Sequence, residues 1–133
     1  MKRFMLGLLG LLVLLAAAAG MLLESGEVVL LETRDAAGQV HETRLWVVDH
    51  DGFAWLRTGD PTAPWLVRLR EKPEVAVTRA GVRREYRAVP GDDPAMRDRI
   101  NALVLEKYGL AEQALRVLML KPDGVTPIRL EPY

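Results

Sequence analysis

Three arginines have the side-chain chemistry and the spacing to hold an anion between neighbouring elements. Arg44 lies in a stretch with the pattern of a strand, Arg57 is near the end of the next such stretch, and Arg68 follows in a short helical stretch. A guanidinium group binds a phosphate or a carboxylate through two parallel hydrogen bonds. The alternative for each of them is an ordinary arginine in a surface ion pair. We treat all three as candidate anion contacts.

Thr58 and Gly59 follow Arg57 directly, at the point where a strand is expected to end before a helix. Free backbone N–H groups near the start of a helix can bind an anion, because the helix dipole adds partial positive charge there. A simple turn is the alternative, since glycine often interrupts regular structure. This segment extends the candidate anion site.

Three tryptophans, Trp46, Trp55 and Trp65, lie in the same part of the chain. An indole can stack on the ring of a cofactor, but aromatic residues in strands more often pack in the core. We expect at least two of the three to be core residues and place Trp65 at the edge of a pocket. Trp46 shares its strand with Arg44, which makes it a candidate ligand contact as well.

The sequence does not predict a metal site or a nucleophilic catalytic group. The two histidines, His41 and His50, have no third ligand at metal spacing, and the chain has no cysteine. Neither a catalytic triad nor a phosphate-binding loop motif is present. The catalytic residues therefore remain unknown, and a redox enzyme of this kind would rely on its cofactor for the chemistry.

The charge of the chain argues against a nucleic-acid partner. The whole chain has 18 basic and 18 acidic residues, and only Lys2 and Arg3 are charged before Glu24. Removing these two leaves 16 basic against 18 acidic groups in the remainder, a net charge of −2. A nucleic-acid-binding protein would need an excess of basic groups.

The spacing of apolar residues predicts a mainly β domain. Short alternating stretches bounded by turn residues predict about six strands, at residues 28–34, 40–49, 53–58, 74–78, 82–89 and 126–130. Two or three helices are expected, at residues 63–71, 94–108 and 111–118. Hairpins dominate this order, so an antiparallel barrel or strongly curled sheet with appended helices fits best.

The N-terminus predicts a membrane anchor. Lys2 and Arg3 precede the apolar run Phe4–Leu23, which as a helix would be about 30 Å long, the thickness of a bilayer core. We expect residues 1–23 to form one transmembrane helix in the cytoplasmic membrane, with the domain of residues 24–133 on the outer, periplasmic side. A signal peptide cleaved near Ala16–Ala18 is the alternative.

Several motifs resemble those of a known family in their order and spacing. They are Glu42–Val48 (ETRLWVV), Pro64–Pro73 (PWLVRLREKP) and Thr126–Leu130 (TPIRL). Together they resemble the split β-barrel flavin and deazaflavin oxidoreductases of the nitroreductase and quinone-reductase branch, over nearly all of residues 28–131. The resemblance implies a split antiparallel β-barrel, a bound FMN or deazaflavin and, by analogy, a homodimer.

Two positions depart from the family pattern. The first turn of the family has a basic Arg-Lys-Ser-Gly sequence that contacts the cofactor phosphates, whereas this chain has Asp35–Gly38, without a basic residue. The asparagine of the family's helix motif is replaced by Arg68. Phosphate binding would then be rebuilt around Arg44 and Arg68, or the cofactor is different or absent.

Two functions follow as expectations. The first is a membrane-tethered oxidoreductase that reduces a quinone or nitroaromatic-like acceptor. The alternative is a non-catalytic split-barrel module that holds a small ligand or a partner protein at the membrane surface. In the first case the expected cofactor contacts are Arg44, Trp46, Arg57, Thr58, Gly59, Trp65 and Arg68.

Overall fold

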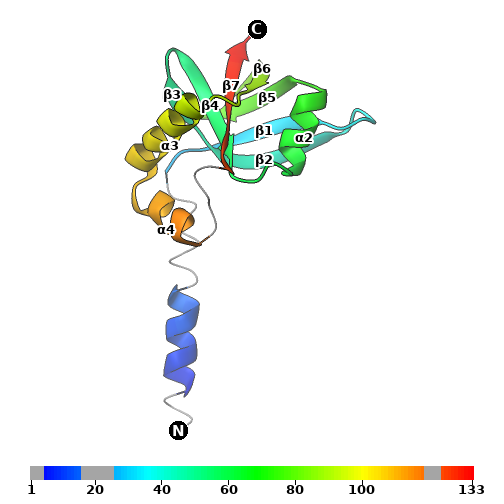
Figure 1. Cartoon of the computed structure of the whole chain (residues 1–133). Coiled ribbons are helices and arrows are strands. Elements are labelled where there is room, and N and C mark those ends of the chain that lie inside the picture. Colours follow the sequence, from blue (N-terminus) through cyan, green and yellow to red (C-terminus); the bar gives the residue numbers. More distant parts are fainter. Residues whose placement is uncertain (1–4, 16–25, 119–123) are drawn as a thin grey trace.

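The computed structural model describes residues 5–15, 26–118 and 124–133. A helix covers residues 5–15, and the remaining elements follow in the order β1 (Val28–Arg34), β2 (Val40–Trp46), β3 (Val48–His50), β4 (Phe53–Thr58), α2 (Pro64–Glu71), β5 (Glu74–Arg79), β6 (Val82–Pro90), α3 (Pro94–Tyr108), α4 (Leu110–Leu118) and β7 (Thr126–Pro132). Figure 1 shows these elements along the chain.

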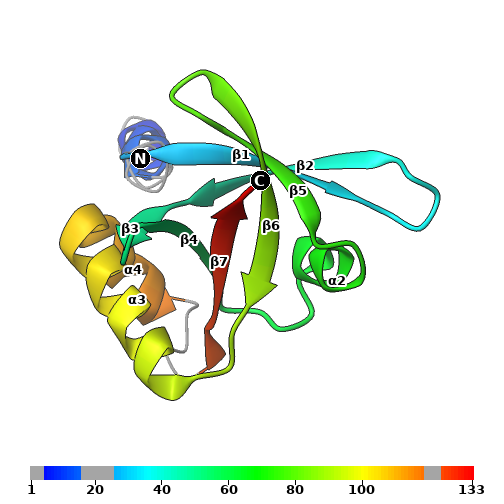
Figure 2. The same cartoon turned by 90° about the horizontal axis from the view of Figure 1, so that it is seen from above.

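All seven strands of the described residues belong to one antiparallel sheet, in the order β2-β1-β5-β6-β7-β4-β3. The two edge strands, β2 and β3, are consecutive in the chain and are separated only by Val47. The chain itself therefore joins the two edges, and the sheet is strongly curled, as Figure 2 shows from above.

The inner core lies between the curled sheet and α2. Trp65, Leu66 and Leu69 of α2 are buried and pack in one cluster with inward side chains of the strands, including Leu31 and Leu56. Pro64 suits the first turn of this helix, where its missing N–H has no partner to lose. Burial of the helix's apolar stripe thus holds α2 against the sheet.

A second cluster lies on the other side of β3 and β4, where α3 packs. Ile100, Val104 and Tyr108 of α3 contact Val48 and Trp55. The helix begins at a side-chain cap, since the Asp93 carboxylate accepts a hydrogen bond from Ala95 N at 3.1 Å. Gly109 ends it with a φ of +54°, a conformation that glycine adopts at little cost.

The structure corrects the predicted fold class. About six strands and two or three helices were expected, whereas the described residues form seven strands and four helices. The extra strand arises because the stretch expected to run over residues 40–49 is divided at Val47 into β2 and β3. The first part pairs with β1 as a hairpin, with Val28 opposite Trp46 and Arg34 opposite Val40.

The predicted transmembrane helix is contradicted. The span was placed at Phe4–Leu23, and the part of it that the structure describes is a helix over residues 5–15, which is about 16 Å, or half a bilayer core. Among the described residues no helix is both long and apolar enough to cross a membrane. The predicted single-pass location in the cytoplasmic membrane, with an outer domain, is wrong for the same reason. Residues 16–25, with the expected boundary at residue 23, lie outside the described residues.

Candidate functional site

The break between β2 and β3 is held by the side chain of Tyr108. Its hydroxyl accepts a hydrogen bond from Val47 N at 3.0 Å, and its proton is directed at two carbonyls, Glu27 O at 2.6 Å and Val47 O at 3.0 Å. The Tyr108 ring stacks on Trp46, with ring centroids 4.3 Å apart. Burial raises the pKa of the Tyr108 hydroxyl above its ordinary value of 10.0, so the group stays protonated and able to donate at neutral pH.

Four charged side chains surround the same break. Arg79 donates to both carboxylates of Glu27 and Asp49 at 2.8–2.9 Å, and Lys107 donates to Glu27 Oε1 at 2.7 Å. Hydrogen bonds from Arg79, and then Lys107, lower the pKa of Glu27, and the hydrogen bond from Arg79 lowers the pKa of Asp49. These groups are matched in charge and serve to fix the strand ends.

Arg57, one of the predicted anion contacts, is engaged inside the domain. Its side chain is only 6% exposed, and its guanidinium donates to Asn101 Oδ1 at 2.9 Å and to Glu112 Oε1 at 2.6 Å. The Glu112 side chain is fully buried. Desolvation is the largest influence on Arg57 and lowers its pKa, while the Glu112 carboxylate opposes this effect. Arg57 therefore neutralises a buried carboxylate from α4, and a ligand phosphate would have to displace that carboxylate.

The neighbouring predicted residues have local roles. The Thr58 hydroxyl exchanges hydrogen bonds with the backbone N and O of Asp60, both at 3.1 Å. Gly59 is exposed in the loop between β4 and α2. Trp65 is 7% exposed and packs in the inner core cluster. Arg57, Thr58 and Gly59 lie next to one another because they are consecutive in the chain. Trp65 could contact a ligand only if the core around it opened.

Arg44, Trp46 and Arg68 occupy three different surroundings. Arg44 is exposed on β2, opposite Leu30 of β1. Trp46 is partly buried against Tyr108. Arg68 Nε donates to the hydroxyl of Thr33 at 2.8 Å, on the inward side of β1. The fold thus distributes the predicted residues over the two faces of the sheet, and their role in binding a cofactor remains a prediction.

Two basic side chains from outside the Asp35–Gly38 turn donate hydrogen bonds to its backbone at the end of the β1–β2 hairpin. Arg34 Nη1 donates to Gly38 O at 3.1 Å, and Lys72, from just beyond α2, donates to Asp35 O at 2.9 Å. The Asp35 carboxylate accepts from His41 at 2.8 Å and from the backbone of the turn; the hydrogen bond with His41 is the largest influence lowering the pKa of Asp35. Two cations therefore lie at the turn that appeared purely acidic.

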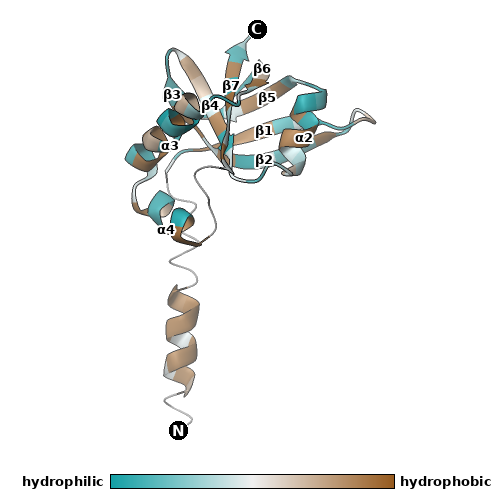
Figure 3. Cartoon of the chain, in the orientation of Figure 1, coloured by the Kyte–Doolittle hydropathy of each residue, from teal (hydrophilic) through white to brown (hydrophobic). Residues whose placement is uncertain are grey.

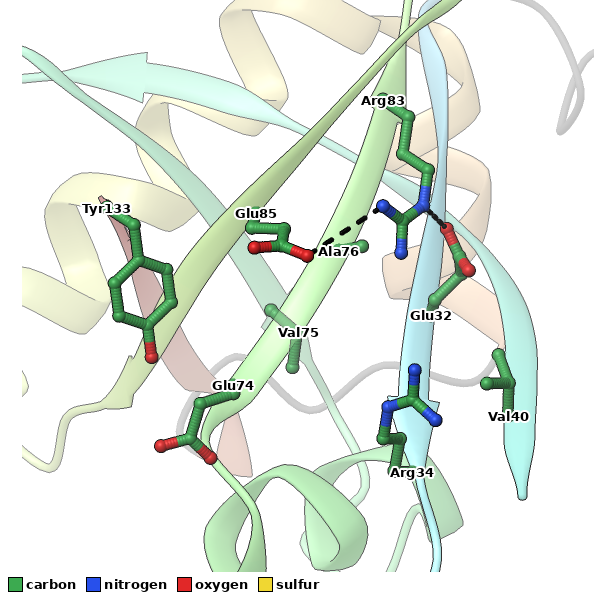
Figure 4. A pocket seen from close by; sticks show the side chains of 9 residues that line it. All are labelled: Glu32, Arg34, Val40, Glu74, Val75, Ala76, Arg83, Glu85 and Tyr133. Carbon is green, nitrogen blue, oxygen red and sulfur yellow. Dashed lines mark hydrogen bonds and ion pairs between the residues drawn. The ribbon is translucent and has the colours of Figure 1, made fainter. Parts of the chain in front are cut away.

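A pocket of about 230 Å³ lies on the outer face of the sheet beside this hairpin. Figure 4 shows Arg34 and Arg83 directed into it from β1 and β6, with the ring of Tyr133 on the opposite side. Its lining residues are Glu32, Arg34, Val40, Glu74, Val75, Ala76, Arg83, Glu85 and Tyr133. The pocket combines an apolar floor, an aromatic edge and two guanidinium groups.

The charges of this outer-face pocket limit what it can hold. Two arginines face three glutamates, and one arginine is already paired, because Arg83 Nε donates to Glu32 at 2.8 Å. A second carboxylate, Glu85, lies 4.0 Å from Arg83 Nη1. The lining fits a ring-bearing ligand with one anionic group near Arg34 better than it fits a multiply charged phosphate chain.

The residues of this pocket were not among those predicted from the sequence. Arg34 and Glu32 alternate with the inward residues Leu31 and Thr33 along β1, a pattern visible in the sequence. Arg34 and Glu32 share the pocket with Arg83 and Tyr133 because of the order of β1, β5, β6 and β7 in the sheet, which the pattern of each strand alone does not reveal.

No group of acidic or histidine side chains within the described residues is arranged to bind a metal ion.

Together, these features define a small antiparallel half-barrel with an open pocket on the outer face of its sheet. No protein-family model matches the chain, and no curated protein matches its sequence. Solved structures do: the chain shares the fold of solved split β-barrel proteins.

Three of these structures illustrate the likeness. The conserved hypothetical protein Rv2991 of Mycobacterium tuberculosis is 22% identical, with a TM-score of 0.61, covering 88% of this chain and 79% of the other. The heme storage protein HutZ of Vibrio cholerae is 17% identical, with a TM-score of 0.63, covering 88% and 89%. A putative pyridoxamine 5'-phosphate oxidase of Listeria innocua is 15% identical, with a TM-score of 0.60, covering 89% and 93%. At these identities the shared property is the fold.

Proposed function

We propose that the chain binds a flavin- or deazaflavin-type cofactor and acts as an oxidoreductase on a quinone or nitroaromatic-like acceptor. The fold is consistent with this class, since a solved structure described as a putative pyridoxamine 5'-phosphate oxidase shares it. The observation that carries the proposal is the outer-face pocket of Figure 4, where guanidinium groups, an aromatic ring and apolar side chains converge. These are the elements that hold an anionic, ring-bearing molecule.

Each part of the outer-face pocket has a role in this proposal. Val40 and Ala76 offer apolar surface for the ring, and Tyr133 offers an aromatic edge. Arg34 has no ion pair among the described residues, so its remaining donors are available to an anionic group. When bound, the cofactor supplies the hydride chemistry, and the protein positions it.

A second candidate is a binding module without redox chemistry. The observation in its favour is that three arginines already bind side chains of the protein itself. Arg57 binds Glu112, Arg68 binds Thr33 and Arg83 binds Glu32. A pocket with more carboxylates than guanidinium groups would prefer a ring-bearing ligand that carries little net charge. A partner protein instead of a small ligand would belong to the same class.

The deciding experiment is an absorbance spectrum of the purified chain, followed by titration with riboflavin, FMN and a deazaflavin. The proposal expects a bound or bindable flavin or deazaflavin, and reduction of a quinone or nitroaromatic by the loaded protein after its cofactor has been reduced with a chemical reductant such as dithionite. Arg34→Gln should weaken binding about tenfold or more, the range for one charge-assisted hydrogen bond. Arg70→Gln, an exposed change on α2 outside the pocket, is the matched control.

The outcomes separate the two functions. Binding with turnover supports the oxidoreductase, and binding without turnover supports the binding module. Binding that is equal in the wild type and Arg34→Gln removes the outer-face pocket from either function. A complete lack of binding to all three compounds would refute the cofactor proposal.

A further inference from the structure

Part of β6 has an unpaired side within the curled sheet. β5 pairs with β6 from Val82 to Arg87, whereas β7 pairs with it only from Tyr86 to Pro90. Among the described residues, the segment Val82–Glu85 therefore has a neighbouring strand on one side only. The unpaired side of a strand presents backbone N–H and C=O groups to which another extended chain can bind. We call the unpaired side of Val82–Glu85 the open edge of β6.

Two backbone hydrogen bonds show which residue faces the open edge. Ala88 N donates to Pro73 O at 2.8 Å, on the side of β5. Gly91 N donates to Pro127 O at 2.9 Å, on the side of β7. Successive residues of a strand direct their N–H and C=O groups to opposite sides, and Arg83 lies an even number of positions before Gly91. Arg83 therefore directs both of its backbone groups to the open edge, whereas its two neighbours direct theirs toward β5.

The side chain of Arg83 leaves the open edge accessible. Its Nε donates to Glu32 of β1 at 2.8 Å, and β1 lies on the far side of β5. Figure 4 shows this guanidinium directed toward Glu32. Charged side chains on an edge strand often serve to block pairing with other chains, which is the alternative here. The Arg83 guanidinium is held on the β5 side, however, so it does not cover its own backbone groups.

A hollow lies beside the open edge on each face of the sheet. On the outer face this is the pocket described above, whose lining includes Arg83, Glu85 and Tyr133. A second hollow, of about 420 Å³, is lined by Arg84, Glu85, Tyr86, Pro132 and Tyr133. Tyr86 packs against the inner core cluster, so the second hollow reaches the inner face. A strand added at the open edge would direct alternate side chains to the two faces, one toward each hollow.

Arg84 indicates the chemistry of the chain that would bind. It is exposed and forms no ion pair among the described residues. A carboxylate directly opposite it on an added strand would form a favourable cross-strand pair. Val82 is on the same face and 51% exposed, so it would pair with an apolar side chain. This edge would select its partner by backbone hydrogen bonds and charge, unlike the N-terminal helix, which Figure 3 shows as apolar on all sides.

We propose that the open edge of β6 binds an extended, acidic segment of a partner protein as an added antiparallel strand. The segment runs in the direction of β7 and places a carboxylate opposite Arg84. Its next residue forms hydrogen bonds with the Arg83 backbone, and the residue after that is apolar and lies opposite Val82. The proposal goes beyond the cofactor proposal, and its test uses no cofactor.

Fluorescence anisotropy with the full chain tests the proposal. The probe is a labelled, end-blocked peptide with the sequence threonine, glutamate, threonine, valine, threonine, and saturable binding is expected. Methylation of the backbone nitrogen of the middle threonine, which pairs with Arg83, should weaken binding at least tenfold. Methylation of the glutamate nitrogen, which points away from β6, should change binding less than twofold and is the matched control. Both changes are made in the peptide, so neither affects the folding of the domain.

An exchange of charge provides the second readout. Arg84→Glu should weaken binding of this peptide at least tenfold and should favour a peptide with lysine in place of glutamate. Arg70→Glu, the same change at an exposed position of α2, should bind as the wild type does. Absence of binding, or equal weakening by the two methylations, would overturn the proposal. So would sedimentation that shows a dimer dissociated by Arg84→Glu, because a second copy would then occupy the open edge.

Discussion

The hydroxyl oxygen of Tyr108 lies 3.0 Å from both the backbone nitrogen and the carbonyl oxygen of Val47. Val47 is the single residue between the two edge strands of the sheet, so its backbone groups have left the ladder on both sides. The Tyr108 side chain, at the end of α3, therefore provides hydrogen-bond partners for the backbone groups of Val47, where β2 and β3 are joined. A buried backbone group without such a partner would be costly.

Tyr108→Phe tests this relationship. The ring can still stack on Trp46, but Val47 N–H loses its partner, so the free energy of unfolding should fall by about 1–3 kcal/mol. Urea denaturation followed by tryptophan fluorescence measures the change. Tyr86→Phe is the control, because no hydrogen bond of the Tyr86 hydroxyl is found among the described residues. Equal effects of the two changes would show that the hydroxyl contact at Val47 adds no stability.

The buried pair of Arg57 and Glu112 leads to a second prediction. Glu112→Ala leaves the 6%-exposed Arg57 guanidinium without its carboxylate, and breaking a buried pair in this way costs about 3–5 kcal/mol. The double change Arg57→Met with Glu112→Leu removes both charges and should recover much of that loss. Denaturation of the single and double variants measures this. A double variant as unstable as Glu112→Ala would indicate that packing, and not charge, decides the cost.

Stability should fall in acid because of the cluster at the strand break. The pKa values of Glu27 and Asp49 are lowered from 4.5 and 3.8 by hydrogen bonds from Arg79, with help from Lys107 for Glu27. A lowered folded-state pKa gives stability that is present above the unfolded value and is lost as the pH falls through the folded value. The loss should therefore begin near pH 4.5 and continue below pH 3.8.

Urea unfolding at a series of pH values from 7 to 3 would measure this dependence. Arg79→Gln should be less stable at pH 7 and should lose less on acidification, because it has less favourable interaction left to lose. Arg84→Gln, an exposed change on β6, should keep the wild-type slope. An unchanged slope in Arg79→Gln would remove this cluster as its cause.

The position of the ligand can be decided by comparing Arg44→Ala with Arg34→Gln. If a phosphate-bearing cofactor binds the site predicted from the sequence, Arg44→Ala should weaken its binding by about 1.5–3 kcal/mol and Arg34→Gln should have little effect. If the outer-face pocket holds the ligand, Arg34→Gln should have the larger effect. Titration of FMN and a deazaflavin into each variant gives the answer. Equal binding to both variants and to the wild type would exclude both arginines.

Local patterns in the sequence predicted several elements because their causes are local. Asp93 caps α3 and Pro94 occupies its first turn, as these residue types favour at the start of a helix. The alternation over Val28–Arg34 indicates a strand with one buried face. Asp35–Gly38 forms the turn that its residue types favour, with Gly38 at a φ of +82°. Such preferences act over a few residues and need no distant partner.

Long-range contacts decided the rest. The sequence of residues 40–49 reads as one strand, and only Tyr108, 61 positions after Val47, explains why it divides into two. Arg57 was predicted as a ligand contact from its local sequence, which does not reveal that it pairs with Glu112 of α4, 55 positions away. Arg34 meets Arg83 and Tyr133 because the order of strands places β1, β5, β6 and β7 side by side. Residue types determined which groups could be charged or apolar. The order of the strands in the sheet decided which of these groups became neighbours. This order depends on the whole chain and not on local preferences, because strands distant in sequence pair with one another.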